Sequence, residues 1–471
     1  MSFEDGAPGG PATLLKGPNS RAGFGQAAVL GLQHALSMDV YVVPFLIGGA
    51  LGLPPAQRAE LIAAGFLAAG IASLVQSQLC LRMPLMQGPS YVPIGAVIAV
   101  ASEAGGGMAG LGTAFAALVP GALLLTLLGW PLRLFHRVIE RLVPPLVGGA
   151  IIVVVGITLI PVVLQGDVLS GDPALLPGNL LLALASGGLS VLASTLGAAF
   201  RKRLAPLRAA SVLAALLGGS LIAWGMGRLD LSPVATAPWL QLPHLAGLDS
   251  VAHVSASAVL TMLLVYAVVL AETTGTWLVV AAVTNTPFDR ARADRGAFGE
   301  GLGCLVSALL GSVPVTGYAS NGGVIALTGI ASRGVFAAAA FCLVAFGLCG
   351  KLAACIACVP APVIGGLFGV LCAIIVMSGL RIVAQDRGND GRGNGFDERG
   401  TMVVGLPILL GLGTVLLPHG LVAGLPLLAR ELLGSGTAIG AGAAILLNLL
   451  LPHPAGLPPV QTETMLDRDA P

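Results

Sequence analysis

Charged residues are scarce in this 471-residue chain: they make up 10% of it, against about a quarter in an ordinary soluble domain. Aromatic residues are also few, at 5%, whereas 56% of the residues are hydrophobic. The basic residues are dispersed in short stretches and are not interleaved with aromatic side chains, so the chain has no nucleic-acid-binding footprint. The composition therefore excludes a soluble globule, and we expect no nucleic-acid partner.

Segments of about ten residues with alternating polarity, which mark a membrane β-barrel, are missing as well. Unbroken apolar runs such as 181–200 and 401–417 recur along the chain instead. Gly (67 residues) and Pro (32 residues) are abundant, as expected where helices pack closely and are interrupted inside lipid. We predict an all-α membrane protein with the lipid bilayer as its surroundings.

The seven cysteines lie within or beside apolar segments, without Asp or His at a metal-binding spacing. Cys355 and Cys358 form a C-x-x-C motif, which we interpret as helix packing because the surrounding segment is apolar. We predict no disulfide framework, no metal site and no cofactor. A membrane enzyme would need a catalytic cluster, such as a His pair or a nucleophile with its base, and the sequence indicates none.

Apolar runs of about 20 residues mark the predicted membrane segments. Fourteen runs are bounded by charge, Pro or Gly, at residues 26–52, 59–79, 91–104, 108–128, 143–165, 178–198, 209–226, 255–283, 297–312, 321–331, 334–357, 361–384, 401–418 and 434–451. The third and tenth runs are too short to cross a bilayer as helices. Residues 1–25 lack the compact apolar core of a signal peptide, so we predict cytoplasmic tails at 1–25 and 452–471.

Lys and Arg are distributed unevenly between the two sides of this segmentation. If both termini are cytoplasmic, 19 of the 23 Lys and Arg residues fall inside. The remaining four fall outside or near it, and they are Arg58, Arg228, Lys351 and Arg430. The asymmetry follows the positive-inside rule and predicts a multi-pass protein of the plasma membrane, of the bacterial inner-membrane type.

The two short segments indicate an internal duplication. Residues 91–100 align with residues 318–327 at a constant offset of 227. Because seven segments separate the copies, the second copy enters the membrane upside down, which gives a 7+7 inverted repeat. Each short segment is a half-helix that begins at mid-membrane and presents free backbone N–H groups and the positive end of its dipole. The preceding stretches, 84–90 and 311–317, are predicted to pair as two short antiparallel strands because lipid cannot satisfy their backbone.

One acidic side chain stands out, because ionisable groups inside membrane segments are costly and mark functional sites. Glu272 lies deep in the eighth segment, with Thr273, Thr274 and Thr276 around it. We predict that Glu272 is a substrate-binding carboxylate. The alternative is a carboxylate that a neighbouring helix satisfies and that has no other role.

Three further ionisable residues and two tyrosines are candidates for the same site. His34 in the first segment can relay a proton or bond across helices. Asp39 would be turned about 140° away from His34 on one helix, so the two are not expected to face one ligand. Glu300 opens the ninth segment near the cytoplasmic surface, where the helix dipole also favours an acid. Tyr91 and Tyr318, at the mouths of the half-helices, can fill the bundle or stack on a planar ring, and we favour stacking.

Several motifs carry a family resemblance. Asn321, Gly323 and Thr328 form an Asn-x-Gly signature followed after four residues by Thr. Further agreements are Gln33 and His34, Gln87 and Gly88, Ser90 and Tyr91, Glu272 and Gly275, Glu300 and Gly301, and Pro360 with Gly365 and Gly366. With these motifs the chain from about residue 27 to residue 452 resembles the nucleobase-ascorbate transporter family, whose bacterial members are proton-linked uracil, xanthine and urate permeases.

The resemblance implies a core domain and a gate domain, with a homodimer formed through the gates. The core would consist of residues 26–128 and 255–357, and the gate of residues 143–226 and 361–451. The resemblance also implies an elevator-like movement of core against gate, driven by the proton gradient.

The resemblance further implies roles for particular residues. Glu272 would accept hydrogen bonds from base N–H groups, beside Ser90 and the backbone N–H groups at Tyr91 and Ser320. Asn321 would brace the half-helix junction. Proton coupling or structural support would fall to the remaining candidates, which are His34, Glu300, Asp39 and Thr276.

Three positions depart from the family pattern. Ser320 stands where the signature normally has Gln or Glu, Thr276 stands where xanthine carriers tend to have Asp, and Asp39 lies in a stretch usually free of charge. The expected function is proton-coupled import of a purine such as xanthine or urate, or of uracil. The alternative is an anion exchanger or channel on the same fold, against which Glu272 argues because a carboxylate repels anions.

Overall fold

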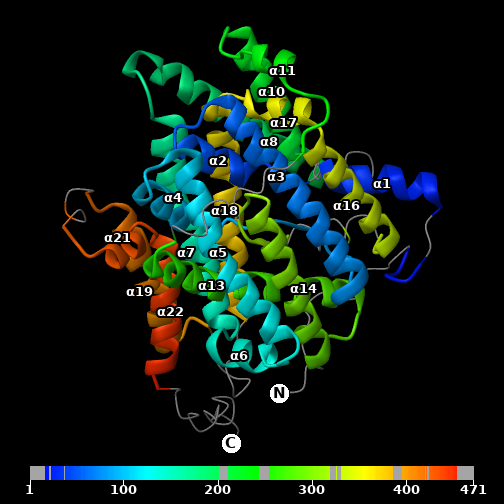
Figure 1. Cartoon of the computed structure of the whole chain (residues 1–471), viewed down its shortest axis with the longest axis vertical. Coiled ribbons are helices and arrows are strands. Elements are labelled where there is room, and N and C mark those ends of the chain that lie inside the picture. The colour runs from blue at the N-terminus through cyan, green and yellow to red at the C-terminus, as the bar shows by residue number, and fades with distance from the viewer. Residues whose placement is uncertain are drawn as a thin grey trace, which may run out of the picture.

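The computed structural model describes residues 16–20, 23–36, 38–200, 211–242, 254–318, 325, 330–385, 395–418, 421 and 424–452. Within these residues the fold is almost entirely helical (Figure 1). Seven helices are long and apolar enough to cross a membrane, or up to nine if each of two bent pairs is one span. The chain is therefore a multi-pass helical membrane protein, and the count of fourteen segments stays a prediction.

The first half of the chain contains an interrupted first segment. Its elements are α1 (Phe24–Leu36), α2 (Val42–Ala50), α3 (Pro55–Leu74), the π-helix η1 (Val75–Cys80), β1 (Gln87–Pro89), α4 (Ile94–Glu103), α5 (Gly107–Gly129), α6 (Phe135–Leu142), α7 (Pro145–Val163), the π-helix η2 (Leu164–Val168), the 3-10 helix η3 (Pro173–Leu175), α8 (Leu176–Ala199), α10 (Ser211–Gly225) and α11 (Ser232–Thr236). The predicted segment 26–52 is not one helix, because α1 ends at Leu36 and α2 begins at Val42. Asp39 lies in this break, so the expected turn of about 140° from His34 along one helix is wrong.

The second half contains two sharp bends. Its elements are α13 (Ala256–Thr284), α14 (Arg290–Leu309), β2 (Val315–Gly317), α16 (Arg333–Leu348), α17 (Gly350–Ala357), α18 (Ala361–Gln385), α19 (Glu398–Val415), α21 (Leu427–Leu433) and α22 (Gly436–Leu450). The chain turns by 78° between α16 and α17, and by 92° between α21 and α22. The predicted eleventh segment is therefore a broken span or a re-entrant loop.

The predicted strand pair is confirmed. β1 and β2 are antiparallel, with Gly88 opposite Thr316, and all six of their residues are buried. Two flanking bonds extend the pairing: the Ser90 N–H donates to the Pro314 carbonyl at 2.9 Å, and the Tyr318 N–H donates to the Met86 carbonyl at 3.1 Å. Because the two strands satisfy each other's backbone, extended chain is tolerated inside the bundle.

The half-helix predicted after β1 is present as α4, which has 10 residues. At 1.5 Å per residue such a helix is about 15 Å long, or half of a hydrocarbon core. The corresponding half-helix after β2 falls at 321–331, where Ile325, Ile330 and Ala331 are the only described residues. The second half-helix therefore stays a prediction.

The helices pack most extensively within two groups. One group surrounds the strands and includes α3, α5, α14 and α16, and the other includes α7, α8, α18, α19 and α22. Glycines permit the closest approaches. A Cβ at Gly129 of α5 would lie 2.2 Å from the backbone nitrogen of Phe298 in α14, and one at Gly366 of α18 would lie 2.0 Å from the Ala183 carbonyl oxygen in α8. Small residues thus serve as helix contacts, as is usual in lipid.

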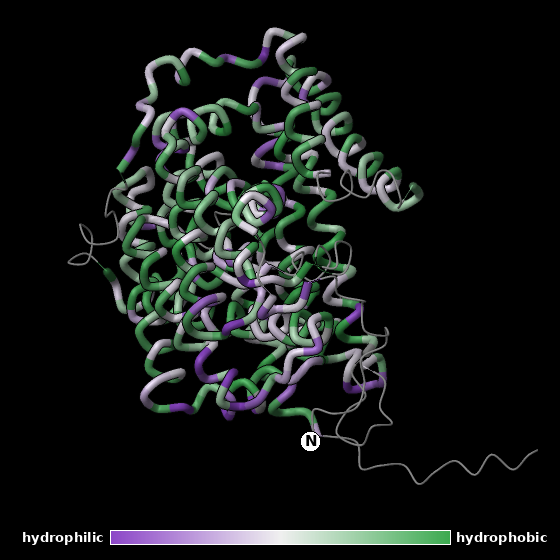
Figure 2. The backbone as a smooth tube through the Cα atoms, turned by 90° about the vertical axis from the view of Figure 1, so that its right-hand side faces the viewer, coloured by the Kyte–Doolittle hydropathy of each residue, from purple (hydrophilic) through white to green (hydrophobic). Residues whose placement is uncertain are grey.

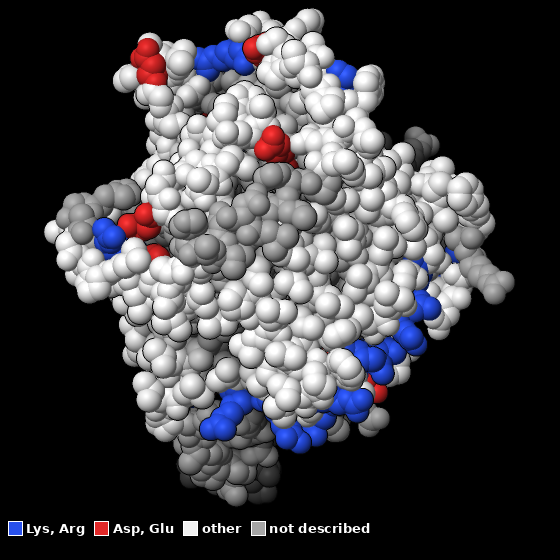
Figure 3. All heavy atoms as spheres, in the orientation of Figure 1, with Lys and Arg blue, Asp and Glu red and all other residues white. Residues whose placement is uncertain are grey.

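Polar residues gather toward the ends of the molecule, and hydrophobic residues dominate its middle (Figure 2). On the face shown in Figure 3, Lys and Arg side chains follow the lower edge, whereas the upper end carries both signs of charge. The lower end contains α6 (Figure 1), whose Arg137 and Arg141 were predicted to be cytoplasmic. This asymmetry agrees with the predicted topology, although the orientation of the termini stays a prediction.

Candidate functional site

Ser90 and Glu272 meet at the point where the strand pair adjoins α4 and α13. The Ser90 hydroxyl donates to Glu272 Oε2 at 2.7 Å, and the Ser90 Oγ accepts the Val92 N–H at 3.2 Å. Among the described side chains, Ser90 is the only donor to this carboxylate. Glu272 keeps part of its surface accessible although it lies in the middle of α13. The structure therefore brings together two residues that were predicted for one site, and among the described side chains none donates to Glu272 Oε1.

Glu300 lies in a closed environment. It is fully buried, and its Oε1 accepts the Thr273 hydroxyl at 2.8 Å. Its Oε2 accepts the Gln76 side-chain amide at 3.1 Å and also the Gln87 side-chain amide. The expected place near a helix start is wrong, because α14 begins at Arg290 and Glu300 lies half-way along it. The helix dipole therefore does not explain this acid, whereas three side-chain donors do.

Thr273 connects the two carboxylates to the strands. It follows Glu272 in α13, donates to Glu300, and accepts the Gly317 N–H of β2 at 3.3 Å. Its neighbour Glu272 is reached from the residue that follows β1. Neighbouring residues of α13 thus contact both strand segments, Glu272 the residue that follows β1 and Thr273 the last residue of β2.

Two glycines of α14 make room for the amides that hold Glu300. A Cβ at Gly299 would lie 2.4 Å from Gln76 Oε1, and one at Gly303 would lie 3.2 Å from Gln87 Oε1. Sequence reasoning missed Gln76, although an amide inside the apolar run 59–79 was a usable signal. The missing information was its partner, which is 224 residues away.

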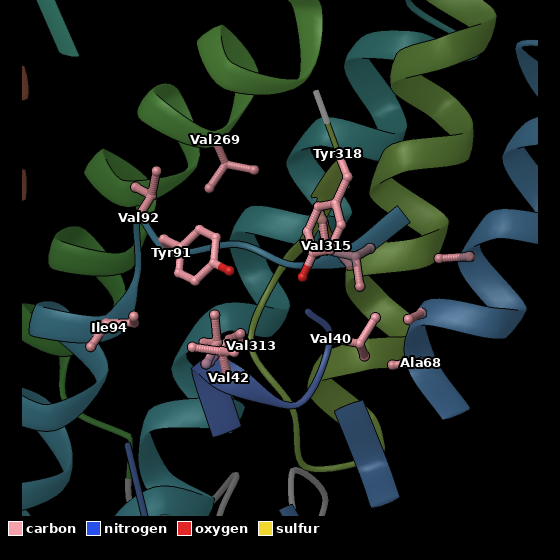
Figure 4. Close-up of a cluster of buried hydrophobic side chains, with 14 of the residues drawn as sticks. Val40, Val42, Ala68, Tyr91, Val92, Ile94, Val269, Val313, Val315 and Tyr318 are labelled. Carbon is pink, nitrogen blue, oxygen red and sulfur yellow. The ribbon is translucent and has the colours of Figure 1, made fainter. Parts of the chain in front are cut away.

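Tyr91 follows β1 and leads into α4. Tyr318 follows β2, which packs against α13. Figure 4 shows their hydroxyl groups pointing toward the space between the two rings. The Tyr91 hydroxyl donates to Asp39, and its ring lies 5.2 Å from the Phe368 ring of α18. The Tyr318 hydroxyl donates to the Pro89 carbonyl at 3.2 Å. Both rings are buried, and their predicted stacking on a ligand stays a prediction.

His34 and Thr276 are not bonded to either glutamate. The His34 ring is buried 4.8 Å from the Phe336 ring of α16, and its Nε2 has no hydrogen-bond partner among the described residues. The Thr276 hydroxyl donates to the Glu272 backbone carbonyl at 3.3 Å, along its own helix. The predicted contacts of Ser320 and Asn321 lie outside the described residues, as do Gly323 and Thr328 of the same signature.

Among the described residues, no group of three His, Cys, Asp or Glu side chains is placed to hold a metal ion. A cavity of about 70 Å³ lies away from the two carboxylates, lined by residues of α3 and α5 and by Gln241. The chemistry of the interior is therefore that of carboxylate, hydroxyl and amide groups.

Comparison with known proteins shows what the chain is similar to. The model of the Permease family, Xan_ur_permease, matches residues 25–420. The uric acid permease PucK of Bacillus subtilis is 30% identical over 90% of this chain and 95% of its own length. The uracil permease of Bacillus caldolyticus is 31% identical over 92% and 93%, and the xanthine permease XanP of Escherichia coli K12 is 30% identical over 91% and 92%.

Solved structures share the fold at lower identity. The transmembrane domain of the cyanobacterial bicarbonate transporter BicA has a TM-score of 0.59, is 19% identical, and covers 85% of this chain and 98% of that one. SLC26A9 has a TM-score of 0.57 and 12% identity, over 89% and 64%. The family model and the relatives show that the chain belongs to the Permease family, and its relatives include uric acid, xanthine and uracil permeases.

Proposed function

We propose that this chain imports a nucleobase, a purine such as xanthine or urate or the pyrimidine uracil, and that Glu272 holds the base. The observation that carries the proposal is the accessible carboxylate at mid-bundle, which has one side-chain donor among the described residues. A carboxylate inside a membrane protein needs further donors. The N–H groups along one edge of a nucleobase supply them.

The relatives support a base as the substrate, because those compared are named as uric acid, uracil and xanthine permeases. The fold alone does not decide, since the structure of a bicarbonate transporter has it too. The charge of the site does discriminate. An inorganic anion such as sulfate has no donor that offsets its repulsion by Glu272, whereas a nucleobase ring offers N–H groups to the carboxylate.

The remaining predicted contacts complete this proposal. Ser90 orients Glu272, and Tyr91 and Tyr318 stack on the ring of the base. Ser320 offers a backbone N–H, and Asn321 braces the second half-helix. Proton coupling passes through Glu272 itself or through Glu300, with His34 and Thr276 in support.

We further propose that transport uses an elevator-like movement and a proton gradient. The helix groups around α3, α5 and α14 on one side, and α7 and α18 on the other, correspond to the proposed core and gate. Contacts between the proposed core and gate include the 2.8 Å ion pair of Arg430 in α21 with Glu103 in α4. Gate domains of two copies would form the homodimer.

Uptake into proteoliposomes tests the function. Purified protein is reconstituted with a proton gradient directed inward, and labelled xanthine, uric acid and uracil are supplied separately. We expect one of them to accumulate, and accumulation to stop when an ionophore dissipates the gradient. Transport of bicarbonate or sulfate, with no uptake of any base, would contradict the proposal.

A further inference from the structure

The break between α1 and α2 contains an acidic residue, Asp39. The Val42 N–H donates to the Asp39 carbonyl at 3.0 Å, where α2 begins. Met38, Val40 and Tyr41 around it are no more than 6% exposed, whereas Asp39 keeps part of its surface accessible. Within residues 38–41, appreciable accessible surface thus remains at the acidic residue alone.

The donors to Asp39 and Glu272 are consecutive residues of the chain. Ser90 donates to Glu272 and the next residue, Tyr91, donates to Asp39, so the two acids flank one pair of residues whose Cα atoms are about 3.8 Å apart. In Figure 4 the hydroxyls of Tyr91 and Tyr318 point toward each other. Two carboxylates and two aromatic rings therefore converge before α4.

We propose that Asp39 is a second ligand-facing carboxylate, which accepts a hydrogen bond from a different edge of the base than the edge held by Glu272. The inference rests on the proposed nucleobase transport and narrows its substrate class. It requires a ring that carries N–H donors on two edges, as oxopurines and uracil do.

The bonding of Asp39 supports this role. Its Oδ2 accepts the Tyr91 hydroxyl, and no other side chain among those described donates to it. Among the described residues, Asp39 forms no ion pair with Lys or Arg. A carboxylate inside the bundle that has acceptor capacity left among the described side chains is stabilised when a ligand supplies a donor. Glu272 has the same deficit, so one ligand with two donor edges satisfies both acids.

Competition with N-methylated bases tests the inference. Uptake of labelled xanthine is measured with unlabelled 1-, 3-, 7- and 9-methylxanthine as competitors, or with 1- and 3-methyluracil if uracil is the better substrate. In the wild type, a methyl group on an N–H that faces either carboxylate should weaken competition about ten-fold or more, because hydrogen bonds to charged groups are strong. Asp39→Ala should raise the KM about ten-fold and abolish the penalty of one methyl position.

Two further variants separate ligand contact from support of Tyr91. Asp39→Asn keeps the size of the side chain and an acceptor for Tyr91, and should still raise the KM. Tyr91→Phe removes the hydroxyl alone and should keep the wild-type methyl pattern. A wild-type KM and methyl pattern in both Asp39 variants would overturn the inference, and so would a Tyr91→Phe variant that matches Asp39→Ala.

The outcomes also distinguish this inference from the function on which it rests. If the wild-type protein takes up no base, the proposed function fails and this inference fails with it. If the wild-type protein takes up a base and Glu272→Gln abolishes uptake while the Asp39 variants behave like wild type, only the second carboxylate is refuted.

Discussion

Glu272 and Glu300 are the same kind of residue in two different environments. Glu272 is partly accessible and, among the described side chains, receives one donor, Ser90. Glu300 is fully enclosed, and Thr273, Gln76 and Gln87 donate to its two oxygens. An acid whose acceptors are all occupied stabilises the helices around it, whereas an acid with free acceptors is available to a ligand. The difference separates a structural role from a binding role within one cluster.

Replacing the open carboxylate should have the largest effect. Glu272→Gln exchanges an acceptor for an amide donor, so we expect uptake of the transported base to fall about 100-fold or more. The thermal unfolding temperature in detergent should stay within a few degrees of wild type, because the Gln carbonyl still accepts the Ser90 hydroxyl. Glu60→Gln, on an exposed residue of α3, is the matched control and should transport normally. Uptake at the wild-type rate in Glu272→Gln would remove the distinction between the two acids.

Replacing the closed carboxylate should affect stability more than binding. In Glu300→Gln the new amide opposes one or more of the three donors, at a cost of about 1–3 kcal/mol. We expect the unfolding temperature to fall by several degrees, and Thr273→Val to lower it by less because it removes one donor. Scanning fluorimetry of the purified variants measures both. An unfolding temperature unchanged by Glu300→Gln would mean that the cluster does not stabilise the bundle.

A smaller effect is expected at Gly88 of β1, which lies between Gln87, a donor to Glu300, and Ser90, the donor to Glu272. A Cβ at this position would lie 2.6 Å from Cζ of Tyr318, so Gly88→Ala must displace the ring. We expect the KM for the base to rise on the order of ten-fold. Gly405→Ala in α19 is the control, because its Cβ would meet no atom within 4 Å. Equal KM values for the two variants would show that Tyr318 does not position the ligand.

The smallest effect is expected for an ion pair near the surface. Glu103 pairs with Arg430 at 2.8 Å, and both side chains are 31% exposed. Solvent screens such pairs, so Arg430→Gln should change stability by less than about 1 kcal/mol and uptake by less than two-fold. Uptake measured at two salt concentrations checks this expectation. A ten-fold change would instead indicate that the pair holds the proposed core and gate together.

The sequence predicted those parts of the fold that depend on local pattern. Apolar runs located the helices, and the unsatisfied backbone at 84–90 and 311–317 predicted the strand pair that β1 and β2 form. The break between Leu36 and Val42 was missed, because the residues around it are as apolar as those of an unbroken helix. Asp39, the charged residue inside the break, was the signal that hydropathy alone averages away.

The site was predicted in part. The cost of a charge in lipid singled out Glu272, and the family motif added Ser90, which donates to it. The enclosure of Glu300 depends on Gln76 and Gln87, which are 224 and 213 residues away, and on the glycines that let them approach. Contacts between residues so far apart leave no periodic pattern in one sequence. The sequence alone therefore did not distinguish the surroundings of the two acids.

Equilibrium binding tests the central claim most directly. Labelled xanthine, uric acid and uracil are titrated in turn against purified wild-type, Glu272→Gln and Glu300→Gln proteins. We predict saturable binding of a base to the wild type, its loss in Glu272→Gln, and its retention in the folded fraction of Glu300→Gln. Binding of the base to Glu272→Gln with wild-type affinity would contradict the account.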